Sequence, residues 1–172
     1  MKERLSMINR LFPETADNTY LGHPIARWLL TFYVVKSFVA GSIHMFASDG
    51  GAESIASITL GDFSQGASDT VVTIFGLWGM EQFVIGLIGA VVLWRYKALI
   101  PVMALAYAIE YFGRFAAQWY TPGVTAENEP PGAVLDTVLV PLAFVMFGLS
   151  LWRSKEESGA LPVNSQNSPS GA

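Results

Sequence analysis

The chain has 172 residues, of which 52% are apolar and only 14% are charged. A soluble domain typically carries about 25% charged residues, so this composition indicates a one-domain membrane protein without room for a second, soluble domain. The net charge of −4 argues against nucleic acid as a partner, and the lack of cysteine excludes disulfides, thiolate metal sites and a cysteine nucleophile.

Residues 1–24 are polar and charged, with neither the apolar region nor the small-residue cleavage site of a signal peptide. Apolar residues recur in this segment at helical spacing, with basic residues between them: Met1, Leu5, Ile8, Leu11 and Phe12, against Lys2, Arg4 and Arg10. The pattern predicts a short cytoplasmic helix lying on the membrane surface. A frayed basic tail is the alternative.

Four apolar stretches follow, at residues 25–47, 70–94, 98–120 and 133–152. Each has about the 20 residues that cross roughly 30 Å of hydrocarbon at 1.5 Å per residue. The predicted fold is therefore all-α, a bundle of four transmembrane helices that forms a membrane domain over residues 25–152. Residues 153–172, rich in Ser, Pro and Gly, are predicted to be a disordered cytoplasmic tail.

The connections between these stretches differ in kind. Arg95, Tyr96 and Lys97 leave so little chain between the second and third helices that the two are predicted to form an antiparallel hairpin, with Pro101 in the first turn of the third helix. The first connection, residues 48–69, is long and rich in Gly, Ser and Asp, with an apolar island at residues 55–60. Loops of this length are often functional lids, and a floppy link is the alternative.

Basic residues predict the orientation of the bundle. Eight lie beside one face, namely Lys2, Arg4, Arg10, Arg27, Arg95, Lys97, Arg153 and Lys155. The two connections at the other face hold Asp49, Glu53, Asp62, Asp69, Glu127 and Glu129 and no basic residue. Both termini are therefore predicted to be cytoplasmic.

Charged residues inside the predicted spans mark the candidate site, because a charge at bilayer depth needs a partner or a function. Glu110 and Arg114 are four residues apart on one helix and are predicted to pair. Lys36 and Glu81 lie at similar depth near the midplane, which makes them the natural second pair if the first two helices are neighbours. The candidate ligand or proton pocket consists of Lys36, Glu81, Gln82, Glu110, Arg114, His44 and Asp136.

Each of these features has a structural alternative. Buried ion pairs can simply hold a small bundle in register. Gln82 can hydrogen-bond across helices or line the pocket, and His44 can be a hydrogen-bonded helix-end histidine or a ligand. With two histidines, a multi-histidine metal site within one chain is excluded, and no catalytic residue, cofactor or metal is assigned.

Small and aromatic residues predict packing and anchoring. Gly76, Gly79, Gly86 and Gly89 of the second helix, with Ala104, Ala108 and Ala116 of the third, supply small residues for close helix contact. Trp28, Trp94, Trp119, Tyr120 and Trp152 lie at span ends, where their rings favour the membrane interface.

The segment 78–114 resembles a group of small bacterial four-helix membrane proteins that have no assigned function. The likeness rests on the sequence WGMEQFVIGLIGAVVLWRYKALIPVMALAYAIEYFGR, with its Trp-Gly, its RYKALIP hairpin and its EYFGR motif. It extends over most of residues 20–152, including 49–63 and 121–150. The resemblance implies a four-helix fold in a bacterial inner membrane and transfers no activity.

Three hypotheses on function follow. The first is binding or transport of a small molecule or a proton through the charged pocket, with the lipid bilayer as a partner. Because four short helices form a thin shell for a solute pathway, this hypothesis favours a homo-oligomer. The second is a membrane enzyme that uses a buried glutamate as acid or base on a lipophilic substrate, an idea with a fold-level analogy to sterol isomerases. The third is an accessory subunit whose charges meet partner helices. Nucleotide loops, a nucleophile elbow and zinc motifs are lacking, which weighs against the enzyme.

Overall fold

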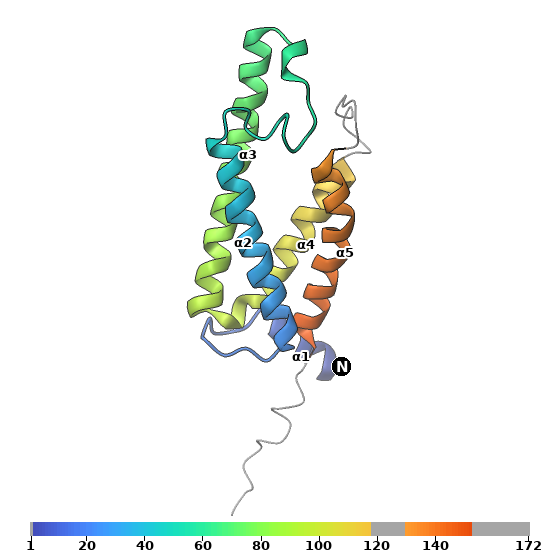
Figure 1. The fold of residues 1–172 in the computed structure, drawn as a ribbon. Coiled ribbons are helices and arrows are strands. Elements are labelled where there is room, and N and C mark those ends of the chain that lie inside the picture. The colour runs from blue at the N-terminus through green and yellow to red at the C-terminus, as the bar shows by residue number, and fades with distance from the viewer. Residues whose placement is uncertain (1, 118–129, 153–172) are drawn as a thin grey trace, which may run out of the picture.

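The computed structural model describes residues 2–117 and 130–152, and in these segments every regular element is helical. The helices are α1 (Lys2–Leu11), α2 (Pro24–Phe46), α3 (Gln65–Arg95), α4 (Ile100–Ala117) and α5 (Pro131–Leu151), with short 3-10 turns η1 (Leu60–Asp62) and η2 (Lys97–Leu99). Four of them, α2 to α5, are long and apolar enough to cross a membrane. Figure 1 shows these four as a bundle with α1 at one end. We call that end the α1 end, and the end beside residues 47–64 the loop end.

Helices α2 and α3 pack closely because glycines line their contact. A Cβ atom on Gly79 would come within 2.8 Å of the Gly41 carbonyl oxygen and 2.7 Å of the His44 Cβ atom. A Cβ atom on Gly89 would come within 2.6 Å of the Val34 side chain. The predicted role of the α3 glycines in close helix packing is therefore confirmed at these positions, and the helix that they contact is α2.

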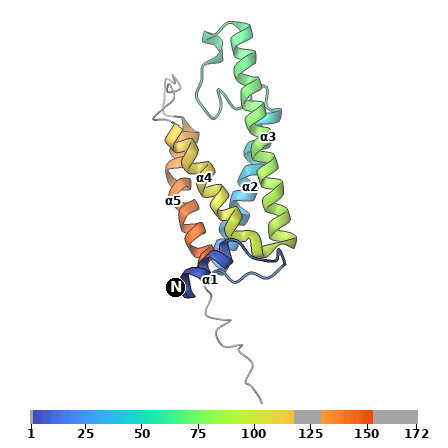
Figure 2. The same cartoon turned by 180° about the vertical axis from the view of Figure 1, so that it is seen from behind.

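Helices α3 and α4 are joined by a tight turn, as predicted, but they contact each other mainly near that turn. The short connection at Tyr96 and η2 reverses the chain. Beyond it, Figures 1 and 2 show α4 leaning away from α3 and running beside α5. The bundle is therefore built from two helix pairs, α2–α3 and α4–α5.

The α1 end holds a close-packed apolar core. Its buried residues from all four long helices include Ala26, Leu30, Val92, Ile100, Met103, Ala104, Leu139, Ala143 and Met146. Helix α1 and residues 12–23 lie against this end (Figure 1), where Arg10 donates a hydrogen bond of 2.7 Å from Nη1 to the carbonyl oxygen of Leu151. This bond places a cation at the C-terminus of α5, where free carbonyls and the helix dipole favour it.

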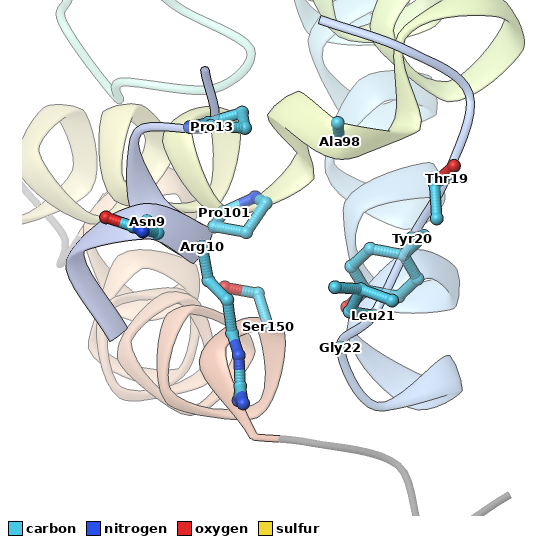
Figure 3. Close-up of a pocket in the computed structure, with 10 residues that line it drawn as sticks. All are labelled: Asn9, Arg10, Pro13, Thr19, Tyr20, Leu21, Gly22, Ala98, Pro101 and Ser150. Carbon is cyan, nitrogen blue, oxygen red and sulfur yellow. The ribbon is translucent and has the colours of Figure 1, made fainter. Parts of the chain in front are cut away.

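A small pocket of about 70 Å³ lies between α1, residues 13–22 and the ends of α4 and α5. Figure 3 shows Arg10 and Ser150 on one side of it and Tyr20 and Leu21 on the other. The Tyr20 hydroxyl donates to the His23 carbonyl oxygen, and burial raises the pKa of this tyrosine above its usual range. Tyr20 is therefore neutral at physiological pH and acts here as a hydrogen-bond donor.

The connection between α2 and α3 is a folded loop, which does not fit the alternative of a floppy link. Asp49 accepts hydrogen bonds from the Gly51 and Ser54 amides, and these bonds lower the pKa of its carboxyl group to about 2. The side chain of Ala52 is fully buried. The amide of Gly132, at the start of α5, donates 3.4 Å to the Ile55 carbonyl oxygen. The loop therefore reaches from one helix pair to the other.

The predicted spans agree with the helices to within a few residues, except at the start of α3. That helix begins at Gln65 rather than at residue 70, and its 31 residues measure about 46 Å. Trp28, Trp94 and Trp152, which were predicted to lie at the membrane interface, are all largely exposed. Trp119, Tyr120 and the predicted tail lie outside the described residues.

Candidate functional site

Four charged side chains gather in the loop-end half of the bundle: Lys36 of α2, Glu110 and Arg114 of α4, and Asp136 of α5. We call them the charged cluster. The predicted pair is confirmed, with Arg114 Nε 3.1 Å from Glu110 Oε1. Arg114 Nη2 also lies 3.5 Å from Asp136 Oδ1, so one guanidinium joins α4 to α5. Each of these three side chains retains 16–18% of its exposure.

Aromatic rings enclose the two cations. The guanidinium carbon of Arg114 lies 4.1 Å from the centroid of the Tyr111 ring and 5.5 Å from that of Trp78. Lys36 Nζ lies 5.1 Å from the same Tyr111 ring. The negative face of an aromatic ring attracts a cation most where water is scarce, so Tyr111 helps to hold both charges.

Tyrosine hydroxyls form a layer between the charged cluster and the apolar core. The buried Tyr33 hydroxyl donates to the Leu139 carbonyl oxygen of α5, and the Tyr107 and Ser37 hydroxyls share a hydrogen bond of 3.2 Å. Sequence reasoning missed Tyr33, Tyr107 and Tyr111. A signal was present, because positions 107, 111 and 114 recur at helical spacing and a tyrosine within a span needs a partner for its hydroxyl.

The predicted ion pair between Lys36 and Glu81 is wrong, although α2 and α3 are neighbours as it required. Glu81 is exposed on α3, and among the described residues it makes no ion pair. Its negative charge is close enough to repel that of Glu110 on α4. The pairing failed because Lys36 extends toward Tyr111 on α4.

Gln82 is 2% exposed, and its Nε2 atom has no hydrogen-bond partner in the described part of the chain. It is one turn from Trp78 and one turn from Gly86, so the three share a face of α3. Trp78 contacts Arg114 and His44, and a Cβ atom on Gly86 would meet Ser37 at 3.2 Å. Gln82 therefore faces the bundle interior between the charged cluster and the Ser37–Tyr107 bond.

His44 anchors the loop to the bundle, which confirms its interpretation as a hydrogen-bonded histidine at a helix end. Its Nδ1 atom lies 2.7 Å from the Gly50 carbonyl oxygen, and its ring stacks on Trp78 with centroids 4.8 Å apart. Gly51 has φ +78°, and a Cβ atom there would meet His44 Nδ1 at 2.8 Å. Only glycine fits that position, for backbone and contact reasons alike.

The charged cluster offers hydrogen bonds and charge to a ligand. In the segments that the structure describes, no three His, Cys, Asp or Glu side chains converge as metal ligands. Two cations and two carboxylates balance each other, and the four are only partly exposed. Such a set can bind a polar group or pass a proton, and it can also hold the two helix pairs together.

The chain was compared with protein-family models, with curated proteins and with solved structures, and nothing matches it. The geometry of the site therefore carries any functional proposal.

Proposed function

We propose that the protein binds a small molecule at the charged cluster, within a bacterial inner membrane that its four long helices cross. The observation that carries this proposal is the arrangement of Lys36, Glu110, Arg114 and Asp136 between two helix pairs, at positions inside membrane-length helices. Ionisable groups at such depth are costly to keep, and in membrane proteins they commonly mark ligand or ion sites.

The apolar core at the α1 end favours binding over passage through one subunit. Leu30, Ile100 and Met146 are fully buried there and fill the bundle below the charged cluster. A molecule that reached the cluster from the loop end would meet this core rather than a continued polar path. Transport would need an oligomer or a rearrangement of the helix pairs.

We further propose that the α1 end faces the cytoplasm, with α1 on the membrane surface. Support comes from the basic residues of the chain, all of which except Lys36 and Arg114 flank the spans on the side of this end. Met7 and Ile8 of α1 expose their apolar side chains, and so does Phe12, which follows the helix. Exposed apolar residues of this kind are typical of a helix that lies on a membrane surface. Cysteine labelling tests the orientation: Asp62→Cys should react with an impermeant maleimide in intact cells, and labelling only after permeabilisation would reverse it.

Native mass spectrometry of the protein released from detergent tests the binding function. We expect a discrete bound species in the wild type that is lost in Glu110→Gln, because Glu110 belongs to the charged cluster. The species should bind more weakly in Glu81→Gln, because the charge of Glu81 acts on Glu110. Glu14→Gln, in the exposed connection at the α1 end, is the matched control and should retain the species. The same spectra report the number of subunits.

A different result would assign the charges to structure. If the wild type carries no bound species and Glu110→Gln only unfolds more easily, the cluster holds the bundle in register. The exposed Glu81 makes Glu81→Gln the variant that should still fold, so loss of the species there is not explained by unfolding.

A further inference from the structure

The site has a surplus of hydrogen-bond donors. Gln82 Nε2 is buried without an acceptor, and Arg114 Nε and Nη2 approach their carboxylates without hydrogen-bond geometry. Lys36 makes no ion pair with any described residue and lies over the Tyr111 ring instead. Buried donors in native proteins are almost always satisfied, and each one left unpaired costs free energy. A molecule that presents acceptors would remove this cost.

Gln82 lies at the depth of the charged cluster. At 1.5 Å per residue, Gln82 on α3 and Glu110 on α4 are both about 20 Å from the turn at Tyr96. The neighbours of Gln82 on its own helix face, Trp78 and Gly86, contact Arg114 and Ser37 respectively. Gln82 therefore lies on α3 between the residue that meets Arg114 and the residue that meets Ser37, and its buried Nε2 atom is on the helix pair opposite α4.

The charges at the site argue against an ionic ligand. Lys36 and Arg114 are balanced by Glu110 and Asp136, so the charged cluster is neutral overall. An anion would be repelled by these carboxylates and by the nearby Glu81. The free-energy cost of removing its charge from water would not be offset. A cation offers no hydrogen-bond acceptor and would leave the free donors unsatisfied. A neutral molecule that carries a hydrogen-bond acceptor adds no charge to the site and satisfies the free donors.

The edge of the site between α3 and α4 faces outward. Glu81 of α3 is exposed, Glu110 of α4 keeps 18% of its side-chain exposure, and the two carboxylates are close enough for their charges to repel each other. The two helices contact each other mainly near their turn (Figure 2). In a bilayer this edge would open toward lipid tails, so the apolar part of a ligand could stay in lipid while its head reached Gln82.

We infer that the site takes a neutral, lipophilic carbonyl compound, whose oxygen accepts hydrogen bonds from Gln82 Nε2 and the Lys36 ammonium and whose head lies beside the Trp78 and Tyr111 rings. This inference rests on the proposed function and adds the chemical class of its ligand. The acceptor would enter from the bilayer between α3 and α4.

A matched series of head groups tests the inference. A long-chain methyl ketone, the carboxylic acid and the primary amine of the same chain length are titrated into the detergent-solubilised protein, and bound fractions are measured by native mass spectrometry. The ketone should bind most tightly. Gln82→Leu should weaken ketone binding about tenfold, the equivalent of one good hydrogen bond. Gln65→Leu, a glutamine exposed at the start of the same helix, should leave it unchanged.

Stability separates a ligand role from a structural one. Because Gln82 Nε2 has no partner, Gln82→Leu should not lower the melting temperature of the ligand-free protein. Ketone binding that Gln82→Leu leaves intact, or a loss of stability in that variant, would overturn the inference. Tighter binding of the acid or the amine, lost in Glu110→Gln, would overturn the carbonyl class while supporting the proposed binding function. Binding of none of the three would overturn the inference, and the wild-type spectra described above would then decide the proposed function separately.

Discussion

The two ends of the bundle are built on different principles although the same four helices form both. At the α1 end, Leu30, Ile100 and Met146 are fully buried and the helices fit by shape. At the loop end, Arg114 joins two carboxylates and two aromatic rings, and charge rather than shape connects the helices. Since close packing can hold helices together without charges, the half that contains the ionisable groups is the half to examine for function.

The largest effect should come from removing the central cation of the loop end. Arg114→Met leaves Glu110 and Asp136 buried without a partner, and we expect a loss of about 4 kcal/mol in the free energy of unfolding. Thermal or denaturant unfolding in detergent measures it. Arg95→Met, an exposed arginine at the α1 end, is the control and should change little.

A second substitution should recover much of that loss. In Arg114→Met with Glu110→Gln, one unpaired charge is gone, so the double variant should unfold later than Arg114→Met alone. If the two variants unfold together, the charges do not couple and the contrast between the two ends is lost.

At the α1 end, Leu30→Ala should cost about 3 kcal/mol, because it empties a fully buried position in a close-packed core. Leu87→Ala removes the same atoms from an exposed position on α3 and should cost far less. Ligand binding at the loop end should survive Leu30→Ala in the fraction that remains folded. Loss of binding there would show that the two ends are coupled.

The contact between α2 and α3 can be widened with one methyl group. Gly79→Ala places a Cβ atom 2.7 Å from the His44 Cβ atom, and we expect a cost of about 2 kcal/mol from the strain of overpacking. Gly76→Ala is the control on the same helix, because its nearest contact would be 3.7 Å away. Equal melting temperatures for the two variants would contradict the close approach of these helices.

The smallest effect should be confined to the loop. The pKa of Asp49 is about 2, below its usual value near 4, so the stability that its hydrogen bonds provide is present above about pH 4 and is lost as the pH falls toward 2. Since the carboxylate is exposed, Asp49→Asn should cost under about 1 kcal/mol. Proteolysis of the loop across this pH range measures it, with Asp62→Asn as the control.

Local sequence patterns predicted most of the fold and only part of the site. Four apolar stretches were enough to place four helices, and the spacing of Glu110 and Arg114 was enough to pair them, because both depend on residues near each other in the chain. The contact of Arg114 with Asp136 and the place of Lys36 over Tyr111 depend on how α4 and α2 rotate against their neighbours. Spacing along one helix does not fix that rotation.

The start of α3 shows another limit. Hydropathy placed it at residue 70, but the first turns from Gln65 are polar, and their hydrogen bonds are made within the helix and to the loop. A hydrophobic window cannot detect a helix that continues beyond the apolar region. Similarly, the folded loop depends on Asp49 and on Gly51 with its positive φ, which composition alone had left open as either lid or link.

The charges on α4 also constrain how the chain enters its membrane. A span that carries Glu110 near its middle inserts poorly alone, because a charge at a helix centre costs about 2.5 to 3.5 kcal/mol during translocon-mediated insertion. The turn at Tyr96 ties α4 to the glycine-rich, largely apolar α3, so the two can leave the translocon as a hairpin. The last partner of Arg114 is on α5, which is made later. The ion pair with Asp136 can therefore form only after synthesis has passed that residue. Its formation requires that α5 has packed against α4.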